Sequence, residues 1–148
     1  LPSVAGAQAD SLHEPGANLT AGVRLLRTIY DGYAYCDSLD RWCFTLAEYH
    51  AGPTRITDAR RIAMEQRRDP NRWEGSVTVT LPKLADSVWA GKIVSSPYAG
   101  GRTVRYVNQV LNRARLYAQV VPLDGAAPDS GSAQPALATA LTTPPDFP

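Results

Sequence analysis

The residues best suited to chemistry stand together in the stretch 48–52, Glu-Tyr-His-Ala-Gly. They close an apolar run, so the pattern predicts a helix over 41–51 that ends at a glycine, directly before Pro53. Glycine permits a tight turn and proline cannot continue a helix, so these polar side chains are expected at the mouth of a cleft. Aromatic faces and hydrogen-bonding tips suit carbohydrate. The alternative is a core helix with an ordinary C-cap.

Other kinds of chemistry find little support in the sequence. We find no phosphate-binding loop, dinucleotide fingerprint, zinc motif or nucleophile elbow. His13 and His50 are far apart along the chain, and a catalytic triad would also need a placed Ser or Cys. Cys36 and Cys43 are too few for a structural zinc site. They either pair in an oxidising compartment or leave Cys43 buried and Cys36 exposed. We therefore expect neither a metal nor a cofactor.

Composition indicates one globular domain with a tail. The chain has 148 residues, of which 44% are hydrophobic and 20% charged. Residues 122–148 are rich in Pro, Ala, Ser, Gly and Thr, which predicts a domain over 1–121 followed by a disordered tail. The net charge of +1 provides no field for nucleic acid. No apolar run reaches the roughly 20 residues that span a bilayer. We expect a monomer without a membrane span.

Apolar periodicity predicts an all-α fold. A four-turn stripe follows Asn18, which is the expected N-cap, and Asp40 is expected to cap the helix over 41–51. The buried side of that second helix is expected to carry Trp42, Cys43, Leu46 and either Tyr49 or His50. Thr54 should cap a third helix that ends near residue 68, and a last helix begins at Thr103 and buries a stripe that extends to residue 117 or 118.

The segment 76–81 is ambiguous. It alternates apolar and β-branched residues, which is typical of a strand. A lone strand cannot satisfy its backbone hydrogen bonds, so a short helix over about 77–85 is weighed nearly as highly. The following residues, 86–101, are expected to form a loop whose Trp89 and Tyr98 either contact a ligand or pack at the rim.

Several of these segments together resemble a known family. The resemblance lies in 18–26, 44–52, 58–61 with 69–73, and 104–107. In this order and spacing they are similar to the catalytic domain of lytic transglycosylases, in the lysozyme superfamily. The pieces 58–61 and 69–73 look most like membrane-bound lytic murein transglycosylase F. The similarity covers roughly 1–117 and tips segment 77–85 toward helix.

The resemblance implies a lysozyme-like helical domain that acts on peptidoglycan. Such enzymes cleave the β-1,4 bond between N-acetylmuramic acid and N-acetylglucosamine and leave a 1,6-anhydromuramic end. One Glu acts as general acid and then base, and an apolar cleft keeps it protonated. In the family this Glu ends the first helix, and residues 1–5 resemble the sequence just after it. We therefore expect the acid upstream of Leu1, a chain that lacks the first catalytic helix, and no turnover by the chain alone.

The resemblance also assigns substrate-binding residues. Tyr49 matches the tyrosine of the family's Ala-Tyr-Asn motif on the cleft floor, and His50 stands where the family has Asn. Ala51 and Gly52 form the turn, and Tyr106 matches a tyrosine that faces the catalytic acid. We assign no catalytic role to Glu48 or to the other acids of this sequence. The implied partner is a peptidoglycan glycan strand, in the periplasm or at the cell envelope, including the outer membrane.

Three alternatives remain open from the sequence. The chain could be a non-catalytic peptidoglycan-binding module, which His50 and the absent acid favour. It could be a helical interaction domain that kept the fold and lost the cleft. It could belong to a hydrolytic lysozyme, a variant that the chemical end of the product would distinguish.

Overall fold

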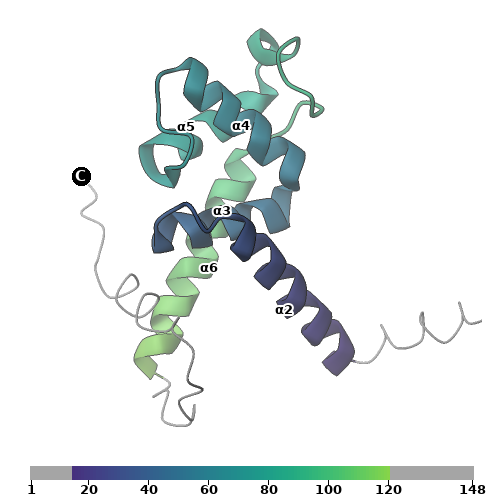
Figure 1. Ribbon diagram of the computed structural model, residues 1–148, viewed down its shortest axis with the longest axis vertical. Helices are drawn as coiled ribbons and strands as arrows, with labels where there is room; N and C mark the ends of the chain where they lie inside the picture. Colours follow the sequence, from purple (N-terminus) through teal and green to yellow (C-terminus); the bar gives the residue numbers. More distant parts are fainter. Residues whose placement is uncertain (1–14, 121–148) are drawn as a thin grey trace, which may run out of the picture.

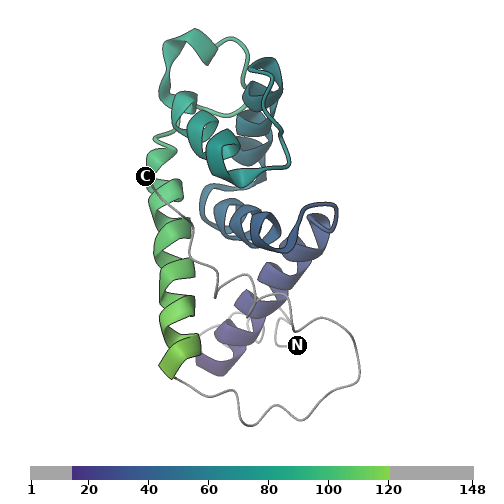
Figure 2. The same ribbon diagram turned by 90° about the vertical axis from the view of Figure 1, so that its left-hand side faces the viewer.

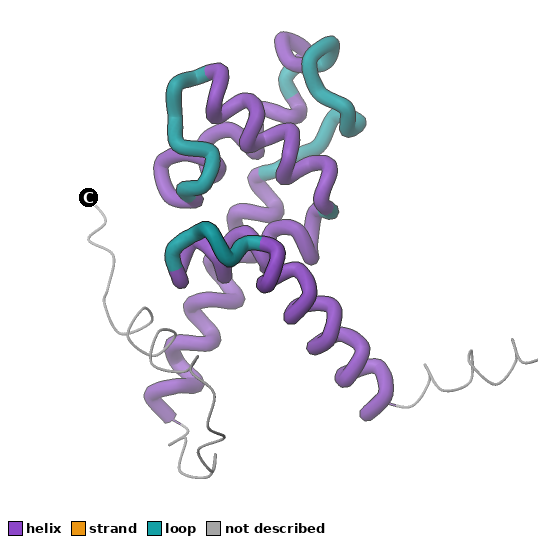
Figure 3. Tube along the Cα trace, in the orientation of Figure 1, coloured by secondary structure: helices purple, strands orange, loops and turns teal. Residues whose placement is uncertain are grey.

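Helices make up the architecture of this protein. A computed structural model describes residues 15–120, in which every regular element is helical and no strand occurs (Figure 3). The predicted all-α class is confirmed. Residues 1–14 and the predicted tail over 122–148 lie outside the described residues. The proposed domain boundary at 121 therefore stays a prediction.

The central element is α3, Ser38–Ala51, which contacts α2, α4 and α6 (Figure 1). A continuous run from Cys43 to Ala47 is buried because helices surround this part of α3. Phe44 is fully buried, stacks on Tyr33 with ring centroids 5.2 Å apart, and meets Trp73 edge-on. The predicted burial of Cys43 and Leu46 is confirmed. The expectation that Tyr49 or His50 lies on the buried side is wrong, since Tyr49 is 47% exposed and His50 is exposed as well.

The start of α3 lies earlier than expected. Asp37 is the N-cap, and its carboxylate accepts the N–H of Asp40 at 2.8 Å. The prediction that Asp40 caps this helix is wrong because its own carboxylate accepts the N–H of Trp73, also at 2.8 Å. Arg41 fixes α2 against this end, since its Nε donates to the Tyr30 carbonyl at 2.7 Å. A tertiary contact therefore decides which aspartate caps.

Helix α2, Pro15–Gly32, also begins earlier than predicted, and Asn18 lies within it. Proline suits the first turn of a helix because its missing N–H is not needed there. Only the end of α2, at Ile29, packs against the core, whereas Leu19 and Val23 are exposed. Figures 1 and 2 show α2 and the C-terminal part of α6 extending away from α3 as two arms.

Helix α4, Pro53–Glu65, follows α3 after one residue. Gly52 occupies the N-cap position with φ 86°, and no side chain caps this helix, so the expected cap at Thr54 is wrong. The helix also ends before residue 68, and Arg67 adopts a left-handed φ of 57° beyond it. Its core-facing stripe is confirmed, with Ile56, Ala59, Ile62 and Ala63 buried.

The ambiguous segment is helical. The wide turn η2 (Trp73–Val77), one turn of α-helix α5 (Thr78–Thr80) and the 3-10 helix η3 (Leu81–Ala85) follow one another, and η4 covers Ser87–Trp89. Buried Val77, Leu81 and Leu84 all face the core, which a helical spacing allows and a two-residue alternation does not. The helix expectation is confirmed and the strand reading is wrong.

The last helix, α6, spans Gly101–Val120. It starts beside η3, where a Cβ on Gly100 would lie 2.2 Å from the Leu81 carbonyl oxygen. Thr103, Val107 and Leu111 are buried. The expected burial of Tyr117 or Ala118 is wrong because Tyr117 is 67% exposed and Ala118 is exposed as well. None of the helices between residues 15 and 120 is long and apolar enough to cross a membrane.

Candidate functional site

A polar cluster forms where the C-terminal end of α3 meets the start of α6. His50 Nδ1 lies 3.0 Å from Thr103 Oγ1, and the Tyr98 hydroxyl lies 2.7 Å from the same oxygen. The Tyr98 hydroxyl is also 3.5 Å from His50 Nδ1. We call His50, Tyr98, Thr103 and the adjacent Tyr106 the His50 cluster. Its members come from α3, from the loop before α6 and from α6 itself, so packing of the whole fold is needed to assemble it.

Two aromatic rings stack in the His50 cluster, of which His50 is exposed and Tyr106 half-buried. The His50 ring stacks on Tyr106 with centroids 4.5 Å apart and planes inclined by 26°. Burial, with a smaller contribution from neighbouring Tyr49, raises the pKa of Tyr106 above its ordinary value. The Tyr106 hydroxyl therefore stays protonated at neutral pH and can donate a hydrogen bond. Tyr49 is nearby, with 47% of its surface exposed.

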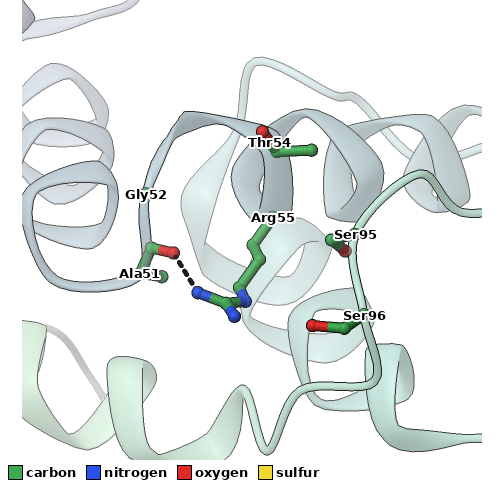
Figure 4. Close-up of a pocket in the computed structure, with 6 residues that line it drawn as sticks. All are labelled: Ala51, Gly52, Thr54, Arg55, Ser95 and Ser96. Atoms are coloured by element: carbon green, nitrogen blue, oxygen red, sulfur yellow. Dashed lines mark hydrogen bonds between the residues drawn. The ribbon is translucent and has the colours of Figure 1, made fainter.

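The turn after α3 borders a hollow of about 270 Å³ (Figure 4). Gly52 makes the turn in the left-handed region, and its N–H donates to the Glu48 carbonyl at 2.7 Å. Arg55 extends from α4 across the hollow, and its Nη1 donates to the Ala51 carbonyl at 2.9 Å. The complete lining is Ala51, Gly52, Thr54, Arg55, Ser95 and Ser96.

One side chain of the His50 cluster, Tyr98, contacts a residue that lines the hollow. The Arg55 guanidinium lies over the ring of Tyr98, 4.3 Å from the centroid, and the hydroxyl of the same tyrosine belongs to the cluster. A guanidinium over an aromatic face gains electrostatic attraction and shields the ring from water. Tyr98 therefore links the hollow to the His50 cluster through its ring and its hydroxyl.

The structure brings the sequence-predicted residues to one place. His50 and Tyr106 stack, Ala51 and Gly52 line the adjoining hollow, and Tyr49 is close enough to Tyr106 to affect its pKa. Sequence reasoning missed Thr103 and Arg55. Neither belongs to a recognisable motif, and only the position of Arg55 just after the Gly-Pro turn could have drawn attention to it.

The acidic side chains nearest in sequence have structural partners. Glu48 accepts a hydrogen bond from the Tyr33 hydroxyl at 2.5 Å, and burial together with this bond raises the pKa of Tyr33. Burial opposes ionisation of Asp58, but the N–H groups of Ser95 and Val94 and the Arg61 guanidinium hold the pKa of that carboxyl below its ordinary value. Both carboxyl groups thus brace the fold.

The two thiols are free. Cys43 is buried and Cys36 half-buried, so the structure shows unpaired thiols, and Cys36 is less exposed than expected. Burial raises the pKa of both. Within residues 15–120 no three His, Cys, Asp or Glu side chains gather in a way that could hold a metal ion.

Comparison with known proteins finds relatives that match part of the chain. No protein-family model matches the chain. A protein of Desulfosudis oleivorans is 33% identical over 95 residues, which are 64% of this chain and 21% of that protein. A protein of Thiobacillus denitrificans is 32% identical over 107 residues, 71% of this chain and 22% of its own length. One of Ectopseudomonas mendocina is 37% identical over 71 residues, 48% of this chain and 14% of its own.

These similarities point to one family. Over the part that it shares with these relatives, this all-helical chain is similar to the lytic transglycosylase family. The three relatives are each named membrane-bound lytic murein transglycosylase F. The chain spans no more than 22% of the length of these three proteins.

Proposed function

We propose that this chain supplies the glycan-binding floor of a peptidoglycan lytic transglycosylase domain. In the intact protein this domain cleaves the β-1,4 bond between N-acetylmuramic acid and N-acetylglucosamine and leaves 1,6-anhydromuramic ends. The names of the relatives support the family and its murein substrate. The bond and the product are inferred from the resemblance of segments 44–52 and 104–107 to the family.

The stack of His50 on Tyr106 is the observation that carries the proposal. A sugar ring binds where an apolar face lies beside fixed hydrogen-bonding groups, and here Tyr49 and Tyr106 provide the aromatic faces. Thr103 orients the imidazole through Nδ1, so Nε2 is left to face a ligand. His50 can therefore substitute for the amide that the family has at this position.

Catalysis needs a carboxylic acid that this part of the chain does not provide. Among the described residues, Glu48 is bound to Tyr33, Asp58 is held by backbone N–H groups and Glu65 pairs with Lys92. None of these three has the apolar, protonated setting that a general acid requires. Burial does raise the pKa of Asp40, but this carboxyl accepts the Trp73 N–H at the opposite end of α3 from the His50 cluster. We infer that the acid is supplied by residues outside 15–120 and that the chain alone binds glycan strands without cleaving them.

The proposal is tested by pull-down of purified chain with murein sacculi, comparing wild type with Tyr106→Ala. We expect wild type to bind and Tyr106→Ala to lose about tenfold in affinity, the loss of roughly one hydrogen bond and one aromatic contact. Tyr117→Ala is the matched control, because Tyr117 lies on the same helix and is exposed. Equal binding by Tyr106→Ala and Tyr117→Ala would contradict the proposal.

The products released from sacculi distinguish the alternatives. Binding without product supports a glycan-binding floor whose acid lies elsewhere, and it fits a non-catalytic module equally until the intact protein is assayed. Anhydro ends released by the intact protein support the transglycosylase, and reducing ends would indicate a hydrolytic lysozyme instead. Lack of affinity in both wild type and Tyr106→Ala would indicate a helical interaction domain.

The proposed substrate also bears on where the intact protein acts. A murein-binding chain must meet its substrate in the periplasm or at the cell envelope, and the relatives' names describe them as membrane-bound. We propose this location for the intact protein.

A further inference from the structure

The hydroxyl groups of Tyr98 and Thr103 form a short hydrogen-bond chain that ends at His50. The Tyr98 hydroxyl lies 2.7 Å from Thr103 Oγ1, and the same oxygen lies 3.0 Å from His50 Nδ1. The direct distance from the Tyr98 hydroxyl to Nδ1 is longer, 3.5 Å, so Thr103 is the link between the two rings. Thr103 is fully buried, Tyr98 is half-buried and His50 is exposed. The chain therefore connects the packed interior to a side chain that a ligand can reach.

The backbone and a neighbouring arginine hold Tyr98 in this position. Its N–H donates to the Leu84 carbonyl at 3.2 Å. The Arg55 guanidinium lies over its ring, 4.3 Å from the centroid, and donates through Nη1 to the Ala51 carbonyl at 2.9 Å (Figure 4). The tyrosine hydroxyl is thus held against Thr103 by contacts that exist in the free protein.

The chain can run in two directions, because each hydroxyl has one proton to donate. In the first direction Tyr98 donates to Thr103, and Thr103 donates to Nδ1 of His50. In the second, Nδ1–H donates to Thr103, Thr103 donates to Tyr98, and the phenolic proton has no other acceptor among residues 15–120. A phenol donates more strongly and accepts more weakly than an aliphatic hydroxyl, because its lone pairs are delocalised into the ring, and a guanidinium over the ring strengthens that tendency. The first direction is therefore favoured.

The first direction determines where His50 carries its proton. A neutral imidazole whose Nδ1 accepts a hydrogen bond is protonated at Nε2. The stack on Tyr106, with ring centroids 4.5 Å apart, would by itself also allow the imidazole to be turned over. The bond from Thr103 disfavours that second orientation, because it would place a ring carbon against Oγ1. This leaves Nε2–H as the polar group of His50 that a ligand can meet.

We propose that Tyr98 and Thr103 are positioning residues that hold His50 as the Nε2–H tautomer, so that His50 meets its ligand as a hydrogen-bond donor and selects an acceptor oxygen. The ligand part of this inference rests on the proposed glycan binding and deepens it. An asparagine at the same position can turn either its amide N–H or its carbonyl toward a ligand, whereas the imidazole held in this form offers only N–H. Tyr98 therefore contributes to affinity through His50.

The tautomer is measured by nitrogen NMR of the imidazole in the free full chain at about pH 8, where an ordinary imidazole is neutral. A His13→Gln background leaves His50 as the only histidine. We expect this chain to show an unprotonated Nδ1 and a protonated Nε2. Tyr98→Phe keeps the ring beneath Arg55, and Thr103→Val keeps the buried volume. Each should raise the ratio of Nδ1–H to Nε2–H about fivefold, the effect of roughly one hydrogen bond. Thr103→Ser should restore the ratio of the starting chain.

Sacculus affinity then shows whether Tyr98 acts through His50. Tyr98→Phe alone should weaken binding about threefold, and in a His50→Ala background it should cause no further loss, because contributions that pass through one side chain do not add. Tyr117→Phe, which removes a hydroxyl from an exposed position on α6, is the matched control and should bind as wild type does.

The possible outcomes separate this proposal from the proposed function. A protonated Nδ1 in the starting chain overturns the proposal, an unchanged ratio in Tyr98→Phe overturns the role of Tyr98, and an unchanged ratio in Thr103→Val overturns that of Thr103. Equal losses of affinity from Tyr98→Phe with and without His50 overturn its action through His50. If Thr103→Val does not fold, the ratio in Tyr98→Phe decides alone. Failure of wild type to bind sacculi contradicts the proposed function, while the tautomer of the free chain still supports or overturns the positioning of His50.

Discussion

The two ends of α3 differ in how their polar groups are used. At the N-terminal end, Asp37 binds the Asp40 N–H, Asp40 binds the Trp73 N–H, and Arg41 binds the Tyr30 carbonyl. At the C-terminal end, His50 is exposed, and the neighbouring Arg55 Nε has no hydrogen-bond partner in the described fold. The same helix thus begins in a closed hydrogen-bond network and ends in an open one.

The difference separates stability from recognition within one helix. A closed network has no capacity left for a ligand, so substitutions there should change the free energy of unfolding and leave glycan affinity alone. An open network has little to lose in the free protein, so substitutions there should mainly change affinity. Both ends have arginine and tyrosine, together with tryptophan at one end and histidine at the other. Charge or aromatic content alone would therefore not have distinguished them.

The largest expected effect comes from Gly100→Ala. This variant should lower both the free energy of unfolding and the affinity for glycan. A Cβ at this position would meet the Leu81 carbonyl at 2.2 Å, so the start of α6 must move. We expect a loss of about 3 kcal/mol in unfolding free energy, measured with urea, together with weaker sacculus binding as Thr103 shifts. Gly91→Ala is the control, because nothing lies within 4 Å of a Cβ there. Equal stability of the two variants would refute this packing argument.

Next in size is Asp37→Ala, which tests the closed end. Loss of the N-cap bond to the Asp40 N–H should lower the unfolding free energy by about 1 kcal/mol. Sacculus binding by the folded variant should equal that of wild type. Reduced binding at full occupancy of the folded state would show that the two ends are not independent.

Asp40→Asn tests how stability at the closed end of α3 depends on pH. Burial, assisted by the charge of Asp37 and opposed by the Trp73 N–H, raises the pKa of Asp40 to about 6. The folded state then holds this proton more tightly than the unfolded state, where the pKa is about 3.9. Stability from this group is therefore fully present below about pH 4 and is lost as pH rises to about 6.

In Asp40→Asn this pH-dependent step in the free energy of unfolding should disappear, because the amide cannot ionise and can still accept the Trp73 N–H. With solvent screening, we expect the step to be about 1 kcal/mol, measured by urea unfolding at several pH values between 4 and 7. Asp31→Asn, at an exposed surface pair, should keep the step. A step that survives in Asp40→Asn would assign it to another group.

The smallest expected effect on stability is that of His50→Ala at the open end. The ring is exposed, so the unfolding free energy should change by less than about 0.5 kcal/mol. Affinity for sacculi should nonetheless fall about tenfold, as one stacking partner and one hydrogen-bonding group are removed. His50→Asn should recover part of the loss. A large drop in stability without loss of affinity would reverse the roles of the two ends.

Sequence alone predicted the helices where apolar spacing is regular. The stripe of Ile56, Ala59 and Ile62 in α4 is an example, because burial on one face sets the period. The caps were less predictable. Asp37 and Asp40 are equally good capping residues, and only the Trp73 N–H, far along the chain, engages Asp40 and leaves Asp37 to cap.

The candidate site, too, was only partly predictable from the sequence. Tyr49, His50 and Gly52 are contiguous, so one stretch of sequence revealed them. Thr103 meets His50 from 53 residues away, and the Arg55 hollow needs the loop that contains Ser95. A single sequence does not specify how that loop folds back on α4, so these partners could be found only from the structure.

The burial of Cys43 makes its thiol a probe of how often the core opens. Its thiol lies in the middle of α3 among fully buried side chains, whereas Cys36 is half-buried and lies in the connection before that helix. An alkylating reagent should therefore reach Cys36 from small local fluctuations, but Cys43 only when the helices around α3 separate. The interval between the two modifications reports how often the core opens, without any label having to be introduced.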